Sequence, residues 1–141
     1  MGENIVSSRA PEPVGAYPHA KRVGDLLFLS GIGPRRRGSA EIPGVTLDAD
    51  GEIISYDIGV QCRAVLENVR AVLEDAGAQW DDIVDVTVFL TNMKNDFALF
   101  NQIYAQYFTS HQPTRTTVEV NRLPTPIAIE LKVIATMRSS S

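Results

Sequence analysis

The feature of the sequence that restricts the fold most is a long helical repeat of apolar residues between Asp57 and Gly77. Apolar side chains recur every three to four residues and charged ones fall between them, which predicts an amphipathic helix. The apolar positions are Ile58, Cys62, Val65, Val69, Val72 and Ala76. Asp57 can cap the start by accepting backbone N–H groups, and Gly77 can supply the left-handed residue that often ends a helix.

A strand and a second helix are expected next. Residues 83–90 alternate between apolar and polar side chains, as a half-buried strand requires. The apolar side is expected to carry Val84, Val86, Val88 and Leu90. Aromatic residues then recur at helical spacing after Asn95-Asp96, either of which can cap a helix. These residues are Phe97, Phe100, Tyr104 and Phe108, and their face is expected to pack on the sheet.

Strands are also expected near both ends of the chain. Two short runs, 20–23 and 26–30, flank Gly24-Asp25, a pair suited to a tight hairpin turn that needs positive φ. Strands at 115–120 and 127–137 are joined by the turn-forming sequence Leu-Pro-Thr-Pro.

The remaining segments have turn-rich composition. Residues 34–52 are rich in Pro, Gly, Arg and Asp, which predicts an excursion on the surface. Residues 1–13 and 138–141 show no periodicity and are expected to be frayed.

The element order, ββ(β)αβαββ, predicts an α+β fold with one mixed sheet and two helices on one face. Residues 1–141 show no internal repeat and no second composition regime, so a single domain is expected. A sheet covered on one face leaves the other face open, and burial against further copies of the chain would cover it. Homo-oligomerisation is therefore expected.

Composition and charge exclude several classes of function. The longest apolar runs, such as Leu26–Leu29, are far short of the roughly 20 residues that cross a bilayer. The N-terminus lacks the features of a secretory signal, so a cytoplasmic location is expected. A net charge of −4 disfavours a nucleic-acid partner. Two distant histidines and the single Cys62 do not suit a metal site, and Cys62 on an apolar helix face is interpreted as a core residue.

An Arg-containing strand, a Leu-Pro turn and a Glu-containing strand follow one another at Pro113–Val120, Leu123-Pro124 and Ile129–Ala135. This order and spacing resemble the Rid (YjgF/YER/UK114) family, and the resemblance covers nearly the whole chain. Further matches are Gly15–Tyr17, Leu29–Gly31, Asn95–Phe97, Asn101 and Tyr104. The resemblance implies a chorismate-mutase-like fold, a homotrimer around a central barrel, and active sites in clefts between subunits. It also implies hydrolysis of an enamine or imine without a cofactor.

Three residues of the late strands are candidate catalytic groups, and Arg115 and Glu130 are expected to lie on adjacent strands and converge on one small cavity. Arg115 offers a planar fork of donors that matches a substrate carboxylate, although an ion pair with Glu119 is the structural alternative. Glu130 is the expected general base and proton relay, the alternative being a solvated carboxylate paired with Lys132. Thr117 projects from the same face as Arg115. Many family members carry cysteine there, so a hydroxyl that positions water or substrate replaces any thiol nucleophile.

Other candidates come from the N-terminal third and the second helix. Tyr17 and Asn101 match family positions that line the pocket, with a packed aromatic ring and a surface amide as the alternatives. Ser30 and Gly31, at a strand end, are expected to bind substrate. His19 is expected to bind substrate and is a candidate extra proton carrier, although a lone histidine is more often structural.

The strand end departs from the common family pattern. It reads Ser-Gly-Ile-Gly-Pro and is followed by Arg35, Arg36 and Arg37. This arginine run is either a solvated basic loop or a binding site for a second carboxylate, with Arg35 as the expected contact.

The arginine run and residues 17–22 resemble a subgroup that acts on 2-aminomuconate. The expected reaction is hydrolysis of its imine form to 4-oxalocrotonate and ammonia, as part of aromatic-amine catabolism. The alternatives are a general deaminase of 2-aminoacrylate and related imines, a ligand-binding protein without turnover, and, least favoured, a ribonuclease.

Overall fold

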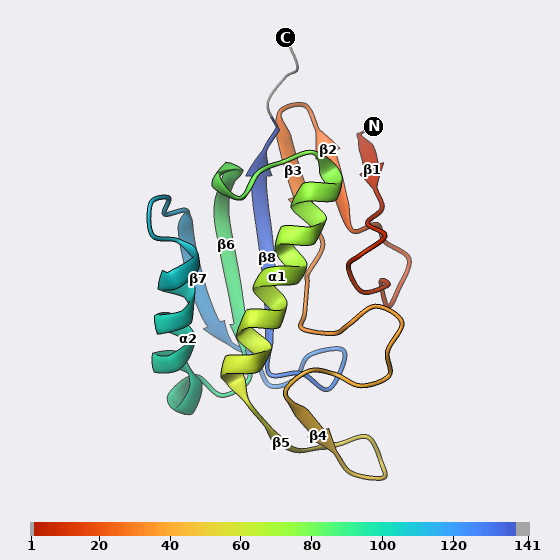
Figure 1. Ribbon diagram of the computed structural model, residues 1–141, viewed down its shortest axis with the longest axis vertical. Helices are drawn as coiled ribbons and strands as arrows, with labels where there is room; N and C mark the ends of the chain where they lie inside the picture. The colour runs from red at the N-terminus through yellow and green to blue at the C-terminus, as the bar shows by residue number, and fades with distance from the viewer. Residues whose placement is uncertain (1, 138–141) are drawn as a thin grey trace.

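The computed structural model describes residues 2–137 as a sheet covered on one face by two helices (Figure 1). The strands are β1 (Glu3–Ile5), β2 (Ala20–Val23), β3 (Leu26–Leu29), β4 (Val45–Leu47), β5 (Ile53–Tyr56), β6 (Ile83–Leu90), β7 (Thr114–Glu119) and β8 (Ile129–Thr136). The helices are α1 (Ile58–Ala76), the short 3-10 turn η1 (Trp80–Asp82) and α2 (Met93–Tyr107). The expected α+β architecture, with two helices on a mixed sheet, is confirmed.

The main sheet has the strand order β1-β2-β3-β8-β6-β7. Among the described strands only β6 and β7 pair in parallel. Helix α1 crosses β8 and helix α2 lies over β7 (Figure 1). The core lies between the helices and the sheet, and its fully buried members include Cys62, Val65, Leu66, Val69, Phe100, Leu27, Val86, Val88 and Leu131. Neither helix in residues 2–137 combines the length and apolarity that crossing a membrane would require.

Helix α1 begins and ends where the sequence predicts. Asp57 is extended, and its side chain accepts a hydrogen bond from the Val60 N–H at 3.1 Å. Gly77 adopts φ 87°, and its N–H bonds to the Glu74 carbonyl at 3.0 Å. A side chain with a Cβ rarely adopts this left-handed conformation, so glycine is well suited to the helix end.

Two local predictions were wrong. Helix α2 is capped by Asn92, whose side chain accepts from the Asn95 N–H at 3.2 Å, and not by Asn95 or Asp96. Asp96 is buried instead and accepts a hydrogen bond from the Tyr56 hydroxyl at 2.6 Å. In β6, a register shift after Ile83 turns Val84 outward, so Val84 is 44% exposed and Ile83 is buried. The bulge breaks the strict alternation.

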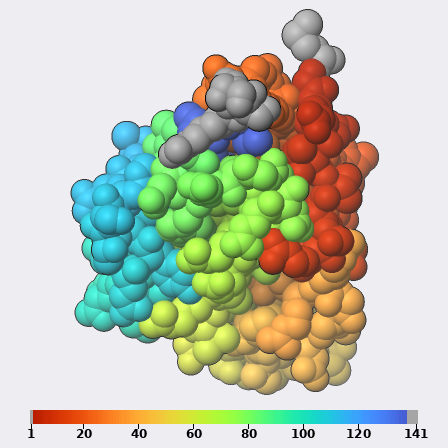
Figure 2. Space-filling model, turned by 45° about the horizontal axis from the view of Figure 1, so that its top comes forward, coloured from red at the N-terminus to blue at the C-terminus, as the bar shows by residue number. Residues whose placement is uncertain are grey.

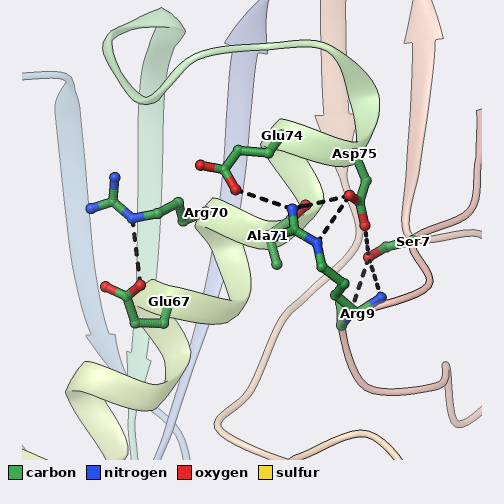
Figure 3. Close-up of polar contacts among 8 residues, drawn as sticks. Ser7, Arg9, Glu67, Arg70, Ala71, Glu74 and Asp75 are labelled. Atoms are coloured by element: carbon green, nitrogen blue, oxygen red, sulfur yellow. Dashed lines mark hydrogen bonds and ion pairs between the residues drawn. The ribbon is translucent and has the colours of Figure 1, made fainter.

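The prediction of a frayed N-terminus was wrong. Strand β1 pairs antiparallel with β2, and Ser7 is fully buried. Figure 3 shows why: the Ser7 hydroxyl donates to Asp75 at 2.6 Å, and Arg9 reaches Asp75 and Glu74, both at 3.1 Å. The N-terminal segment therefore lies along α1 (Figure 2). The prediction for residues 138–141 lies outside the described residues.

The surface excursion at 34–52 contains one strand that the composition did not reveal. Strand β4 pairs antiparallel with β5 across a turn that includes Asp50 and Gly51. The Asp48 side chain accepts hydrogen bonds from the N–H groups of Asp50 and Glu52 and so orders the turn. The resulting hairpin projects from one end of the molecule (Figure 1).

The register of the sheet decides which side chains share a face. Val86 pairs with Arg115 on β7 and with Val133 on β8, and Val88 pairs with Thr117 and Leu131. Directly paired side chains point to the same side. Because Val86 and Val88 are buried under the helices, Arg115 and Thr117 lie on the helix-covered face.

Glu130 lies on the other side of the same sheet. It pairs with Phe89 and alternates with the buried Ile129 and Leu131, so it points to the face that no helix covers. The open face also carries apolar side chains, of which Val23, Leu26 and Val118 are each about 40% exposed.

Candidate active site

Glu130 lines a cavity of about 120 Å³ on the open side of the sheet. Its walls include Tyr17, Gly31, Gly33, Arg35, Pro124, Thr125 and Ile127. The carboxylate lies directly against the backbone of Gly31, where a Cβ atom would stand 2.6 Å from Oε2. A side chain at position 31 would therefore displace the carboxylate from where it lies.

The Glu130 carboxylate is half-buried and has no direct partner. Within residues 2–137 it makes no hydrogen bond or ion pair, and Lys132 donates to the Leu29 carbonyl instead. The alternative of a Glu130–Lys132 pair was therefore wrong. Burial raises the pKa of Glu130 above its ordinary value, and the nearby Arg35 guanidinium opposes part of that rise. A carboxylate in such surroundings is suited to accept a proton from water.

Tyr17 stands at the rim of this cavity. It is 41% exposed, and its hydroxyl accepts a hydrogen bond from the Val14 N–H at 3.2 Å. Tyr17, Gly31 and Arg35 also line an adjoining cavity of about 30 Å³ together with Ser30. The Ser30 hydroxyl donates to the Pro18 carbonyl at 2.7 Å, so its proton is already in use.

His19 has a structural role, contrary to its interpretation as a proton carrier. Its Nδ1 accepts from the Ser7 N–H at 3.0 Å, and its Nε2 lies 2.8 Å from the Pro11 carbonyl, which it can only meet as a donor. Both ring nitrogens are thus occupied by the backbone, and the side chain is 6% exposed. His19 fastens the N-terminal segment to β2.

Of the three consecutive arginines, only Arg35 reaches the Glu130 cavity. Arg35 donates to the Glu12 carbonyl at 2.7 Å, and Arg37 donates to the Ala10 carbonyl at 3.0 Å. Arg36 is exposed. Asn68 of α1 holds the backbone of this arginine segment in place, because its side-chain amide donates hydrogen bonds to the carbonyls of Gly33 and Arg35.

Arg115 lines a second pocket, of about 230 Å³, between α2 and the start of β7. Its guanidinium carbon lies 4.7, 5.3 and 5.9 Å from the ring centroids of Tyr104, Phe100 and Phe97. Such stacking supports a cation without using its N–H donors.

The donors of Arg115 stay free for a ligand. The guanidinium makes no hydrogen bond or ion pair with any described residue. Glu119, the alternative partner, instead accepts a hydrogen bond from the Met93 N–H at the start of α2, at 2.9 Å. The interpretation of Arg115 as a surface ion pair was therefore wrong.

Asn101 and Thr117 lie near Arg115. Asn101 is an exposed residue of α2 that lines the same pocket. Thr117 follows Arg115 by two residues on the same face, and its Oγ1 is buried without a hydrogen-bond partner among the described residues.

A single chain does not bring Arg115 and Glu130 together. Strand β6 lies between their strands, and they project from opposite faces of the sheet. Two strand spacings and three residues along the strands put their backbones on the order of 14 Å apart. The expectation that they meet on adjacent strands was wrong for one copy. A single copy carries two separate half-sites, the Arg115 pocket and the Glu130 cavity.

Cys62 does not resemble a nucleophile. It is fully buried, and burial raises the pKa of its thiol to about 12. Between residues 2 and 137 no three His, Cys, Asp or Glu side chains lie close enough together to hold a metal ion.

Several residues of the Glu130 cavity and the Arg115 pocket were not among the predicted site residues. Gly33, Thr125 and Ile127 line the Glu130 cavity, and Tyr104 supports Arg115, although it was given no role in the site. Two signals for Tyr104 were available, its match to the family and a hydroxyl that packing alone does not require.

Comparison with known proteins places the whole chain in one group. The family model described as Endoribonuclease L-PSP matches residues 7–137. A RutC family protein of Pyrococcus horikoshii is 43% identical over 136 residues, which are 96% of this chain and 98% of that protein. The 2-iminobutanoate/2-iminopropanoate deaminase of Escherichia coli is 36% identical over 98% of this chain and 100% of its own length.

A solved structure shows the same fold. The crystal structure of E. coli TdcF with bound serine superimposes with a TM-score of 0.82 at 37% identity. The match covers 97% of this chain and 99% of that one.

Proposed function

The chain belongs to the Rid (YjgF-like) family, whose model is described as Endoribonuclease L-PSP, and from this premise we propose that it hydrolyses 2-imino acids to 2-oxo acids and ammonia. The observation that carries the proposal is a guanidinium with free donors together with a half-buried carboxylate of raised pKa that has no partner. A relative that deaminates 2-iminobutanoate and 2-iminopropanoate supports the substrate class. A bound serine in a related structure supports a ligand that carries a carboxylate.

The proposed reaction needs only positioning and proton transfer. Arg115 holds the substrate carboxylate through two parallel N–H donors. Glu130 accepts a proton from a water molecule as the oxygen adds to the C=N carbon, and it passes this proton to the nitrogen, which gives a neutral amino alcohol. Glu130 then takes the hydroxyl proton and delivers it to the amine nitrogen, so the C–N bond breaks, the C=O bond forms and ammonia leaves. Atoms balance as imino acid plus water giving oxo acid plus ammonia.

The separation of Arg115 from Glu130 supports a site that is shared between two copies of the chain. The Arg115 pocket lies on the helix side beside β7, an edge strand, and the Glu130 cavity lies on the open side. We therefore include in the proposal a homotrimer in which one subunit supplies Arg115 and its neighbour supplies Glu130. In that arrangement Asn101 and Thr117 belong to the first subunit, and Tyr17, Gly31 and Arg35 belong to the second.

Ammonia release tests the proposed reaction directly. Wild-type protein should accelerate ammonia release from freshly generated 2-iminobutanoate, and Arg115→Ala should lower kcat/KM by about 100-fold, because charged hydrogen bonds to the carboxylate are lost. Arg36→Ala, which removes an exposed arginine, is the matched control and should retain activity. A wild-type protein that binds a 2-oxo acid without releasing ammonia would be a ligand-binding protein rather than a deaminase.

The position of Arg35 favours 2-aminomuconate as a second candidate substrate. Its guanidinium lines the Glu130 cavity and can meet the far carboxylate of a dicarboxylic imine. Arg35→Ala should then lower kcat/KM for 2-aminomuconate by roughly tenfold more than for 2-iminobutanoate, which has one carboxylate. Equal losses for both substrates would remove the case for the dicarboxylate.

A further inference from the structure

Two buried hydroxyls beside Arg115 make no hydrogen bond. Tyr104 Oη and Thr117 Oγ1 are the buried side-chain polar atoms that lack a partner among the described residues. Tyr104 as a whole is 8% exposed. A buried hydroxyl without a partner is destabilising and uncommon, so each one requires an explanation.

The contrast with another tyrosine shows that the chain can satisfy such a group. The Tyr56 hydroxyl donates to Asp96 at 2.6 Å. Stacking against the Arg115 guanidinium does not require a hydroxyl on Tyr104. Phe97 and Phe100 contribute to the same aromatic surface, and neither has a hydroxyl. The Tyr104 hydroxyl is therefore not needed for packing.

Both residues lie beside Arg115, whose donors are free for a ligand. The Tyr104 ring centroid is 4.7 Å from the Arg115 guanidinium carbon, and Tyr104 lines the same 230 Å³ pocket. Thr117 projects from the same face of β7 as Arg115. A cation with free donors thus has, beside it, two side chains whose hydroxyls lack partners among the described residues.

We propose that Tyr104 is a ligand-binding residue, whose hydroxyl donates a hydrogen bond to the carboxylate held by Arg115, with Thr117 as a second contact. This rests on the proposed function, because it names a further contact of the same anion site. Burial raises the pKa of Tyr104 to about 12, so the phenol keeps its proton and acts as a donor. The hydroxyl is satisfied only when ligand is bound, and it destabilises the free protein.

Removal of this hydroxyl should have opposite effects on stability and binding. Tyr104→Phe keeps the ring under Arg115 and removes only the unpaired group. We expect its Tm to rise by roughly 3 °C. Its Kd for 2-oxobutanoate, measured by calorimetry, should rise about tenfold, and the loss in deamination should appear in KM rather than kcat. Thr117→Val, a near-isosteric change, should shift Tm and Kd in the same directions.

The matched control is Tyr56→Phe, which removes a hydroxyl that has a partner. Its Tm should fall while its Kd and KM stay at wild-type values. A lower Tm for Tyr104→Phe would show that the hydroxyl is satisfied in the free protein and would overturn the proposal. An unchanged Kd would do the same, and so would a wild-type protein that does not bind 2-oxobutanoate. The wild-type protein could also bind 2-oxobutanoate without releasing ammonia from the imine. Weaker binding by Tyr104→Phe would in that case support the Tyr104 contact and reject the deaminase.

Discussion

Glu130 and Arg115 illustrate how two charged residues are kept available for chemistry by different means. Glu130 makes no hydrogen bond with the described part of the chain, and its neighbour Lys132 donates to a backbone carbonyl instead. Arg115 makes no ion pair with any residue between 2 and 137, since Glu119 accepts a hydrogen bond from the Met93 N–H, and aromatic rings take the place of a counter-ion. Both residues thus keep their hydrogen-bonding capacity for a substrate.

The pH dependence of catalysis should report the surroundings of Glu130. The general base must be ionised, so kcat/KM should fall as the pH drops through the raised pKa of Glu130. Arg35→Ala removes the positive charge that lowers this pKa, which should then rise further. The acid limb of the profile should therefore move to higher pH in Arg35→Ala and stay in place in Arg35→Lys. A limb that moves to lower pH in Arg35→Ala would contradict this electrostatic role.

At the scale of elements, the attachment of the N-terminal segment to α1 is a stabilising contact. Ser7 is its centre, since its buried hydroxyl donates to Asp75 and accepts from the N–H groups of Arg9 and Ala10. Asp75 lies near the C-terminal end of α1, where a negative charge is unfavourable, and Arg9 offsets it.

Ser7→Ala should lower the free energy of unfolding by about 1–3 kcal/mol, because hydrogen-bonding groups lose a buried partner. The Ser7 hydrogen bond is the main cause that lowers the pKa of Asp75. The Asp75 carboxylate therefore stabilises the fold above its pKa in the unfolded chain, and this contribution is lost as the pH falls through its lower pKa in the folded state. The variant should lose less stability on acidification than wild type. Ser8→Ala, at an exposed position, is the control for urea unfolding at both pH values.

The elements that could be predicted from sequence are those whose signals are local. Helix α1 has a complete apolar period and both of its caps, and the turn between β2 and β3 contains Gly24 at φ 62°. The start of α2 was misassigned because of a tertiary contact. Asp96 is a residue type that often caps helices, but here its side chain accepts a hydrogen bond from Tyr56 of β5. The N-terminal strand also lacked a local signal, because its partners lie on β2 and α1.

At the scale of the whole molecule, residue types predicted the two charged groups but not their arrangement. The alternation of side chains along a strand shows that Arg115 and Thr117 share a face. It also shows that Glu130 points to the opposite face from its apolar neighbours in the sequence. It does not show that β6 lies between β7 and β8, which depends on pairings distant in sequence. The separation of Arg115 and Glu130 onto two faces therefore required the structure.

The proposed site between copies predicts complementation of two inactive variants. Arg115→Ala and Glu130→Gln should each be inactive alone. In trimers refolded from an equal mixture, roughly a quarter of the interfaces would join an intact Arg115 to an intact Glu130, so about that fraction of activity should return. Mixing the folded proteins without exchange is the control. No recovery in verified mixed trimers would place both groups of each site in one chain.

The apolar side chains on the open face, among them Val23, Leu26 and Val118, have a thermodynamic consequence. In the proposed assembly they leave water only when subunits associate, so association and folding are linked by mass action. Melting temperatures of this protein would then rise with its concentration, and a value measured at one dilution would not describe the protein at another.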